Sequence, residues 1–289
     1  MTIVLTSIIA GLAAGGAYAL LAVCLVFTYR LVAVVNFTGA AIGACGTFAM
    51  VMLLEQGAPL SVSVAFGLAF GTLTAVVLGA VMIRWFASAP PQTKAAVTVA
   101  LLVGMIALGL RLTGGQHPRP FPDLVPGAAF TFAGVVITRA ALVSITLAMA
   151  FTICATQFLN RTRTGLKLRA LSERPLTAEL SGIPAKKLSI GVWAVAGLAT
   201  TLALMIIAPQ RAPNFLTFSM LVVPAFAAAL IGSFRSFWLT FFGGLALGLL
   251  EGFAAGLESL AQFRSSVPFL IILAVLLWSQ RKARWDEAR

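Results

Sequence analysis

Residues 160–187 read NRTRTGLKLRALSERPLTAELSGIPAKK and hold nine of the chain's 28 charged residues, with long apolar stretches on both sides. Each Arg, Lys or Asp at the centre of a membrane helix costs about 2.5–3.5 kcal/mol, so this segment must lie in water. Seven of its nine charges are basic, which is typical of a cytoplasmic loop. The segment predicts a large cytoplasmic loop near the middle of a membrane protein, where a partner is expected to bind.

The composition agrees with a membrane protein. Hydrophobic residues make up 60% of the chain and charged residues only 10%, against about 25% charge in soluble domains. The net charge of +12 does not indicate nucleic-acid binding, because the basic residues lie at the ends of apolar runs and form no single patch. They report the orientation of the chain in the membrane instead.

Nine apolar segments have about the 20 residues that a membrane helix needs. They lie at about 4–29, 36–54, 60–83, 95–112, 140–159, 188–208, 216–234, 238–256 and 265–280. We predict an all-helical bundle of about nine spans, eight to ten, forming one transmembrane domain over residues 1–289. Lys and Arg divide 15 to 5 between the two sides, which places the N-terminus outside and the C-terminus in the cytoplasm.

Three segments depart from a simple span. Pro224 interrupts 216–234, and 265–280 is short, so either is predicted to be tilted, broken or re-entrant. Residues 112–139 are rich in proline and glycine and predict an ordered external loop without a helix.

Glycines recur every four residues in the eighth segment and form one stripe on a helix face. They are Gly244, Gly248, Gly252 and Gly256. Gly11 with Gly15 and Gly67 with Gly71 repeat the spacing. The stripe predicts close helix packing, either within the chain or with a second subunit.

Groups for covalent chemistry are scarce. Glu251 is the one acid well inside a predicted span, where it is expected either to form a structural hydrogen bond or to line a substrate path. Asp occurs only at Asp123 and Asp286, so no paired carboxylates are expected to hold a metal. No G-x-x-x-x-G-K-[ST] motif is present, so we expect neither an enzyme nor a bound cofactor.

Two classes of transport protein remain. A secondary carrier normally places ionisable groups at the membrane midplane to bind its coupling ion, and this chain has few of them. The permease of a primary transporter takes its energy through a cytoplasmic loop that an ATPase contacts. The loop at 160–187 favours the second class, and a carrier or channel for a small polar solute stays the alternative.

Three blocks of sequence resemble the permeases of branched-chain amino acid ABC importers. GLAAGGAYALLAVCLVFTYRLVAVVNF at 11–37 matches the family's opening at Tyr18, Asn36 and several Gly and Leu positions. AELSGIPAKKL at 178–188 resembles the coupling region, and the glycine-rich block at 228–252 ends in register at Glu251. The order and coverage of the blocks make the resemblance specific.

The resemblance implies a homodimeric or heterodimeric permease of the bacterial inner membrane. Its implied partners are an external solute-binding protein and two cytoplasmic ATP-binding subunits, which would hold the ATP. It also implies a coupling helix near 172–182, and the residues expected to contact the ATPase are Arg169, Glu173, Glu179 and Gly182.

Tyr18, Asn36 and Thr38 are the predicted pathway residues, together with Glu251, because each adds a hydrogen-bonding group to an otherwise apolar route. The chain departs from the family pattern where Arg30 replaces glycine and where NFTGAA at 36–41 replaces N-F-A-H-G-D. The solute therefore stays open among branched-chain amino acids, urea, short amides and other small polar molecules.

Overall fold

The computed structural model describes residues 2–115, 119–132, 135–173, 175–210 and 214–287. Within this part of the chain, seven helices are long and apolar enough to cross a bilayer. They are α1 (Thr2–Val32), α3 (Leu60–Trp85), α4 (Pro91–Thr113), α5 (Arg139–Arg161), α8 (Ala185–Ile207), α11 (Phe237–Gly256) and α12 (Val267–Glu287), the last preceded by the short 3-10 helix η2 (Ala261–Ser266). All seven coincide with predicted spans, which confirms a polytopic helical bundle.

The other two predicted spans are helical but shorter. Residues 36–54 correspond to α2 (Gly39–Glu55), and 216–234 is divided into α9 (Phe215–Ser219) and α10 (Val222–Ile231). The division comes before Pro224, which lies in the first turn of α10, where the missing N–H breaks no intrahelical hydrogen bond. The prediction that this segment is broken is confirmed, and the break lies just before Pro224.

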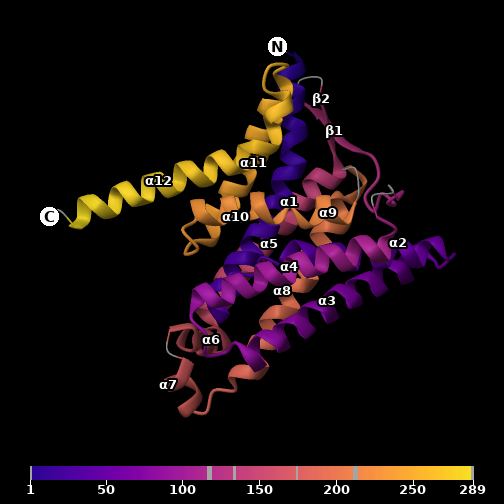
Figure 1. Cartoon of the computed structure of the whole chain (residues 1–289). Coiled ribbons are helices and arrows are strands. Elements are labelled where there is room, and N and C mark those ends of the chain that lie inside the picture. The colour runs from indigo at the N-terminus through magenta and orange to yellow at the C-terminus, as the bar shows by residue number, and fades with distance from the viewer. Residues whose placement is uncertain (1, 116–118, 133–134, 174, 211–213, 288–289) are drawn as a thin grey trace.

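The segment at 265–280 forms part of one continuous helix. α12 is buried over only a small part of its surface, and it extends away from the rest of the bundle beyond α10 and α11 (Figure 1).

A small antiparallel sheet lies in the segment predicted as an external loop. Strand β1 (Ala128–Phe132) pairs with β2 (Val135–Thr138), with Phe130 opposite Ile137 and Thr131 opposite Val136. Their β-branched and aromatic residues favour strands. An ion pair between Arg119 and Glu55 ties the same segment to the end of α2.

The two ends of the bundle differ in character (Figure 1). The strands lie near the N-terminus, and the short helices α6 (Arg163–Glu173) and α7 (Pro175–Leu180) lie at the opposite end. The helices of the basic segment are therefore on the side that the positive-inside rule assigns to the cytoplasm.

Helix α1 lies at the centre of the bundle, and α11 runs antiparallel beside it in the most extensive helix pair of the structure (Figure 1). Gly244, Gly248 and Gly252 of α11 face Ala19, Gly15 and Gly11 of α1 in that order, so the two small-residue stripes of the sequence meet within one chain. A Cβ on Gly248 would overlap the backbone of Gly15. Gly256 is the last residue of the helix and is half-buried.

We predict that Gly248→Val destabilises the protein, because two backbones in contact cannot separate without losing packing along the whole pair. Overpacking of this kind costs about 1–3 kcal/mol. Thermal unfolding of the purified chain in detergent measures the loss. Gly104→Val is the matched control, since a Cβ on Gly104, a glycine of the membrane helix α4, meets no described atom within 4 Å. Equal melting temperatures for the two variants would contradict the prediction.

Candidate solute pathway and cytoplasmic docking face

The chain between α1 and α2 folds back into the bundle as an extended segment. Residues 33–38 have no helical structure, yet Asn36 and Gly39 line the same cavity as Cys24 and Leu25 of α1. Leu25 lies seven residues before the end of α1, about 10 Å along its axis. Non-helical backbone at membrane depth is tolerated only where protein buries it or where it borders a cavity, and this segment does both.

Side chains satisfy the backbone of this segment. The Thr98 hydroxyl of α4 donates to the Val35 carbonyl at 2.8 Å. Asn36 Oδ1 accepts from the backbone N–H of Thr38 at 3.1 Å and from the Thr38 hydroxyl at 2.5 Å, which forms an Asx turn before α2. Asn36 is 4% exposed and Thr38 fully buried, so these bonds hold the turn in one conformation.

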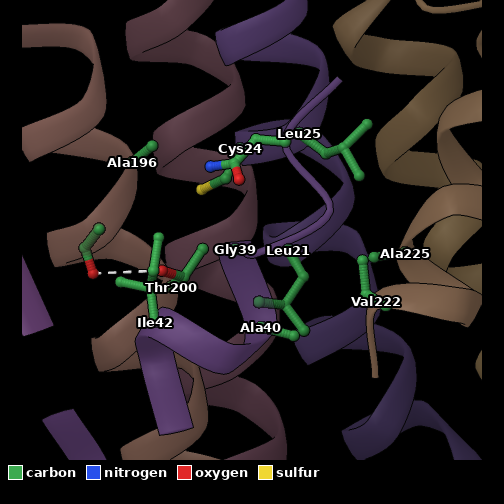
Figure 2. A pocket seen from close by; sticks show the side chains of 12 residues that line it. Leu21, Cys24, Leu25, Gly39, Ala40, Ile42, Ala196, Thr200, Val222 and Ala225 are labelled. Carbon is green, nitrogen blue, oxygen red and sulfur yellow. Dashed lines mark hydrogen bonds between the residues drawn. The ribbon is translucent and has the colours of Figure 1, made fainter. Parts of the chain in front are cut away.

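Four helices surround the cavity that Asn36 borders. Figure 2 shows side chains from α1, α2, α8 and α10 converging on it, with Thr200 of α8 among them. The cavity has a volume of about 10 Å³, which is room for about one water molecule. Asn36 and Thr200 supply polar side chains to a wall that is otherwise mostly apolar.

Aromatic rings fill the bundle on the external side of this cavity. Phe48 lies further along α2 towards the outside, and its ring contacts those of Phe121, Phe215 and Phe218 at centroid distances of 5.3–6.0 Å. Phe121 belongs to the external segment and also contacts Phe218. The external segment therefore packs against α2 and α9 through Phe121.

Tyr18 and Glu251, both predicted to lie on the pathway, bind each other. The Tyr18 hydroxyl donates to Glu251 Oε2 at 2.7 Å across the α1–α11 contact. Tyr18 is 1% exposed, and neither residue lines the cavity beside Asn36. The pair adds a polar bond to the glycine contact between the two helices.

The predicted pathway residues thus occupy different places. Asn36 lies in the cavity wall, Thr38 positions Asn36, and Tyr18 with Glu251 joins two helices. Cys24, Thr98 and Thr200 were not predicted. Thr98 and Thr200 lie in apolar runs, where a single threonine usually satisfies its own helix, and so the sequence gives no signal for them.

Arg30, which replaces a family glycine, does not reach the cavity wall. Its guanidinium lies over the ring of Phe237 at 5.0 Å from the centroid, a cation–π contact between the end of α1 and the start of α11.

The predicted coupling helix at 172–182 is wrong in its bounds, because α6 and α7 divide the segment there. Pro175 is the first residue of α7, the helical position at which proline is best tolerated. Gly182 has φ +79, and the Ile183 N–H donates to the Ala178 carbonyl at 3.2 Å. This is a Schellman cap, which accounts for glycine at 182 by backbone conformation.

Apolar side chains of this loop face water. Leu168 and Leu171 of α6 are buried against the bundle, whereas Leu166 is 62% and Leu180 82% exposed. Leu166 and Leu180 are therefore the large exposed apolar residues of the described part of this loop.

Charged residues occur on the same two helices. Arg169 Nε is buried without a hydrogen-bond partner among the described residues, and Glu173 is exposed at the end of α6. Glu179 lies in the last turn of α7. We call the surface formed by α6 and α7 around Leu166 and Leu180 the docking face.

The fold and the site are those expected of a membrane transport permease: a helical bundle with a small cavity between its helices and exposed leucines on the loop at one end. A family model described as the permease component of a branched-chain amino acid transport system matches residues 7–276. The chain belongs to this family.

Named relatives agree. The chain is 24% identical to the high-affinity branched-chain amino acid transport system permease protein BraD of Pseudomonas aeruginosa, over 95% of this chain and 93% of that one. It is 25% identical to the probable branched-chain amino acid transport permease protein LivH of Methanocaldococcus jannaschii, over 80% and 75% of the two chains. PsaBC from Streptococcus pneumoniae, solved in complex with Fab, has a similar fold, with TM-score 0.52, 15% identity and coverage of 93% and 89%.

We predict that Tyr18→Phe lowers the stability of the bundle by about 1–3 kcal/mol, because it leaves a partly buried carboxyl group without its hydroxyl donor. Thermal unfolding in detergent reports the change. Tyr29→Phe is the control, since the Tyr29 ring packs on Phe234 and its hydroxyl bonds to no described residue. A loss of the same size in both variants would mean that the Tyr18 hydroxyl contributes nothing specific.

Proposed function

We propose that the chain is the permease subunit of an ABC importer that carries branched-chain amino acids, or a related small polar solute, across the bacterial inner membrane. The observation that carries the proposal is the family match over residues 7–276 together with a water-exposed apolar docking face next to the bundle. Family membership supports a complex with ATP-binding subunits, a second permease subunit and an external solute-binding protein. The chain itself is proposed to bind no cofactor.

The solute is proposed to pass beside Asn36. Pockets that hold small ligands measure about 300–1,000 Å³, whereas the cavity here measures about 10 Å³. Passage therefore requires α1, α2, α8 and α10 to separate. Asn36 is the polar group that a solute would meet, because its amide borders the cavity and its turn is fixed by Thr38.

Helix α8 connects the docking face to this cavity. It begins at Ala185, five residues after α7 ends, and Thr200 lies about 22 Å further along the same helix. α6 packs on α1, α5 and α8, so force applied to α6 and α7 reaches the cavity through packed helices. We propose that the ATPase contacts this face near Arg169, Glu173 and Glu179.

We predict that Leu166→Asp with Leu180→Asp reduces the recovery of ATPase at least tenfold, because the two leucines are exposed and contribute to binding more than to folding. The tagged chain is extracted from its native membranes in mild detergent, and mass spectrometry identifies the proteins that copurify.

Leu260→Asp with Phe263→Asp is the control for this experiment, because it places the same two negative charges on exposed apolar residues of the external segment after α11. ATPase should be recovered with wild type and with this control. If the wild-type chain purifies without any ATPase and still supports proton- or sodium-dependent uptake in liposomes, the protein is a secondary carrier.

We predict that Asn36→Ser changes the relative uptake of leucine, valine and a short amide at least threefold. Serine keeps an oxygen for the turn but removes the amide from the cavity wall. Uptake of the labelled solutes into membrane vesicles gives the ratios.

Asn214→Ser is the control for the pathway, since Asn214 Oδ1 caps Thr217 N–H at 2.6 Å in a similar motif that does not line the cavity. Serine is as good a cap as asparagine there. Unchanged uptake ratios in Asn36→Ser would contradict the placement of the pathway, while leaving the importer assignment to the copurification experiment.

A further inference from the structure

A second cavity, of about 100 Å³, lies at the cytoplasmic end of the bundle. The ends of α1 and α3, the starts of α4 and α8, and α6 all contribute to its wall. It is separate from the cavity beside Asn36, and the two share no lining residue.

The wall of this cavity is mostly apolar, and its two charged residues are both basic. Lys94 of α4 and Lys186 of α8 both border it, and none of its described lining residues is acidic. Neither lysine side chain forms a hydrogen bond or an ion pair with a described residue. With no acid in the described wall, an anion is the kind of group that would be attracted to both lysines.

A buried donor without a partner lies in the same wall. Trp193 is 1% exposed, and its Nε1–H has no hydrogen-bond partner among the described residues. Its ring lies against Gly79, so close that a side chain on Gly79 would overlap it. Buried donors are nearly always satisfied, so an unpaired indole N–H beside this cavity is unusual.

The helices add positive potential. α4 and α8 both begin at the cavity after a proline, and neither has a side-chain cap or an acidic residue in its first turn. The N-terminal end of a helix carries partial positive charge and favours an anion. Lys186, Ser189 and Trp193 follow one face of α8, so a lysine, a serine and a tryptophan side chain border one space.

We propose that this cavity binds a phosphate-type anion, held by Lys94 and Lys186 at its mouth and by Ser189 and Trp193 further in. The anion is either the headgroup of an anionic phospholipid or free phosphate. The position at the basic end of the bundle, with Trp85 exposed at the end of α3, is where anionic headgroups meet a membrane protein.

The test uses the full chain purified in a neutral detergent. Thermal shift and native mass spectrometry are recorded with phosphatidylglycerol, with zwitterionic phosphatidylcholine and with inorganic phosphate. We expect saturable stabilisation by phosphatidylglycerol or by inorganic phosphate but not by phosphatidylcholine, and the effective probe identifies the source of the anion. Stabilisation by neither probe, or equally by phosphatidylcholine, would overturn the proposal.

Variants locate the site. Lys94→Gln with Lys186→Gln should weaken binding at least tenfold, and Trp193→Phe, which keeps the ring beside Gly79, should weaken it several-fold. Lys167→Gln with Lys187→Gln removes the same charge from exposed residues outside the cavity and should bind as wild type does. If this control weakens binding as much as the cavity variants, the effect is general surface charge and no site exists. Melting temperatures without added anion show whether each variant is folded.

Discussion

The contact between α1 and α11 is the interaction on which the rest of the bundle depends. Lipid tails are as apolar as leucine, so no hydrophobic force draws two membrane helices together, and close packing must do so. Glycines on both helices remove the side chains that would separate the backbones. The hydrogen bond between Tyr18 and Glu251 adds a polar contact between the same two helices. With α1 fixed in this way, α5, α8 and α10 pack around it.

The chain after α1 can depart from helical geometry because the surrounding helices supply hydrogen bonds to its backbone. A carbonyl such as that of Val35 would cost several kcal/mol in lipid, and the Thr98 hydroxyl removes that cost. The same arrangement brings Asn36 to a cavity wall with its amide oxygen already engaged. A polar group held in this way presents a constant surface to a solute. The segment at 33–38 has no helical structure, and it is also the proposed centre of the transport path.

Much of the fold could be predicted from the sequence. Hydrophobic length places all nine apolar segments in helices, because a bilayer leaves the backbone few alternatives. The residues at which the helices begin and end were less predictable. Pro175 is the first residue of α7 and Pro224 lies in the first turn of α10, and the position of a proline in the chain does not say whether it lies at the start of a helix or ends one. The strands at 128–138 were missed because the prolines before them dominate the composition of that segment.

The candidate site was less predictable than the fold. Asn36 stood out because it is polar within an apolar stretch, and Glu251 for the same reason, yet one lines a cavity and the other joins two helices. Whether such a residue lines a cavity or joins two helices depends on which residues the tertiary structure places next to it. Thr98 shows the converse case, since nothing in its own helix indicates that it bonds to a carbonyl 63 residues earlier.

The position of α11 late in the chain has a consequence for biosynthesis. Ala19 and its partner Gly244 are separated by about 225 residues. At about 5–20 residues per second, a ribosome adds them in roughly 10–45 s. The central helix therefore enters the membrane long before its main partner exists. During that interval its glycine groove is open to lipid or to other membrane helices, and a nascent chain halted before residue 237 would never close it.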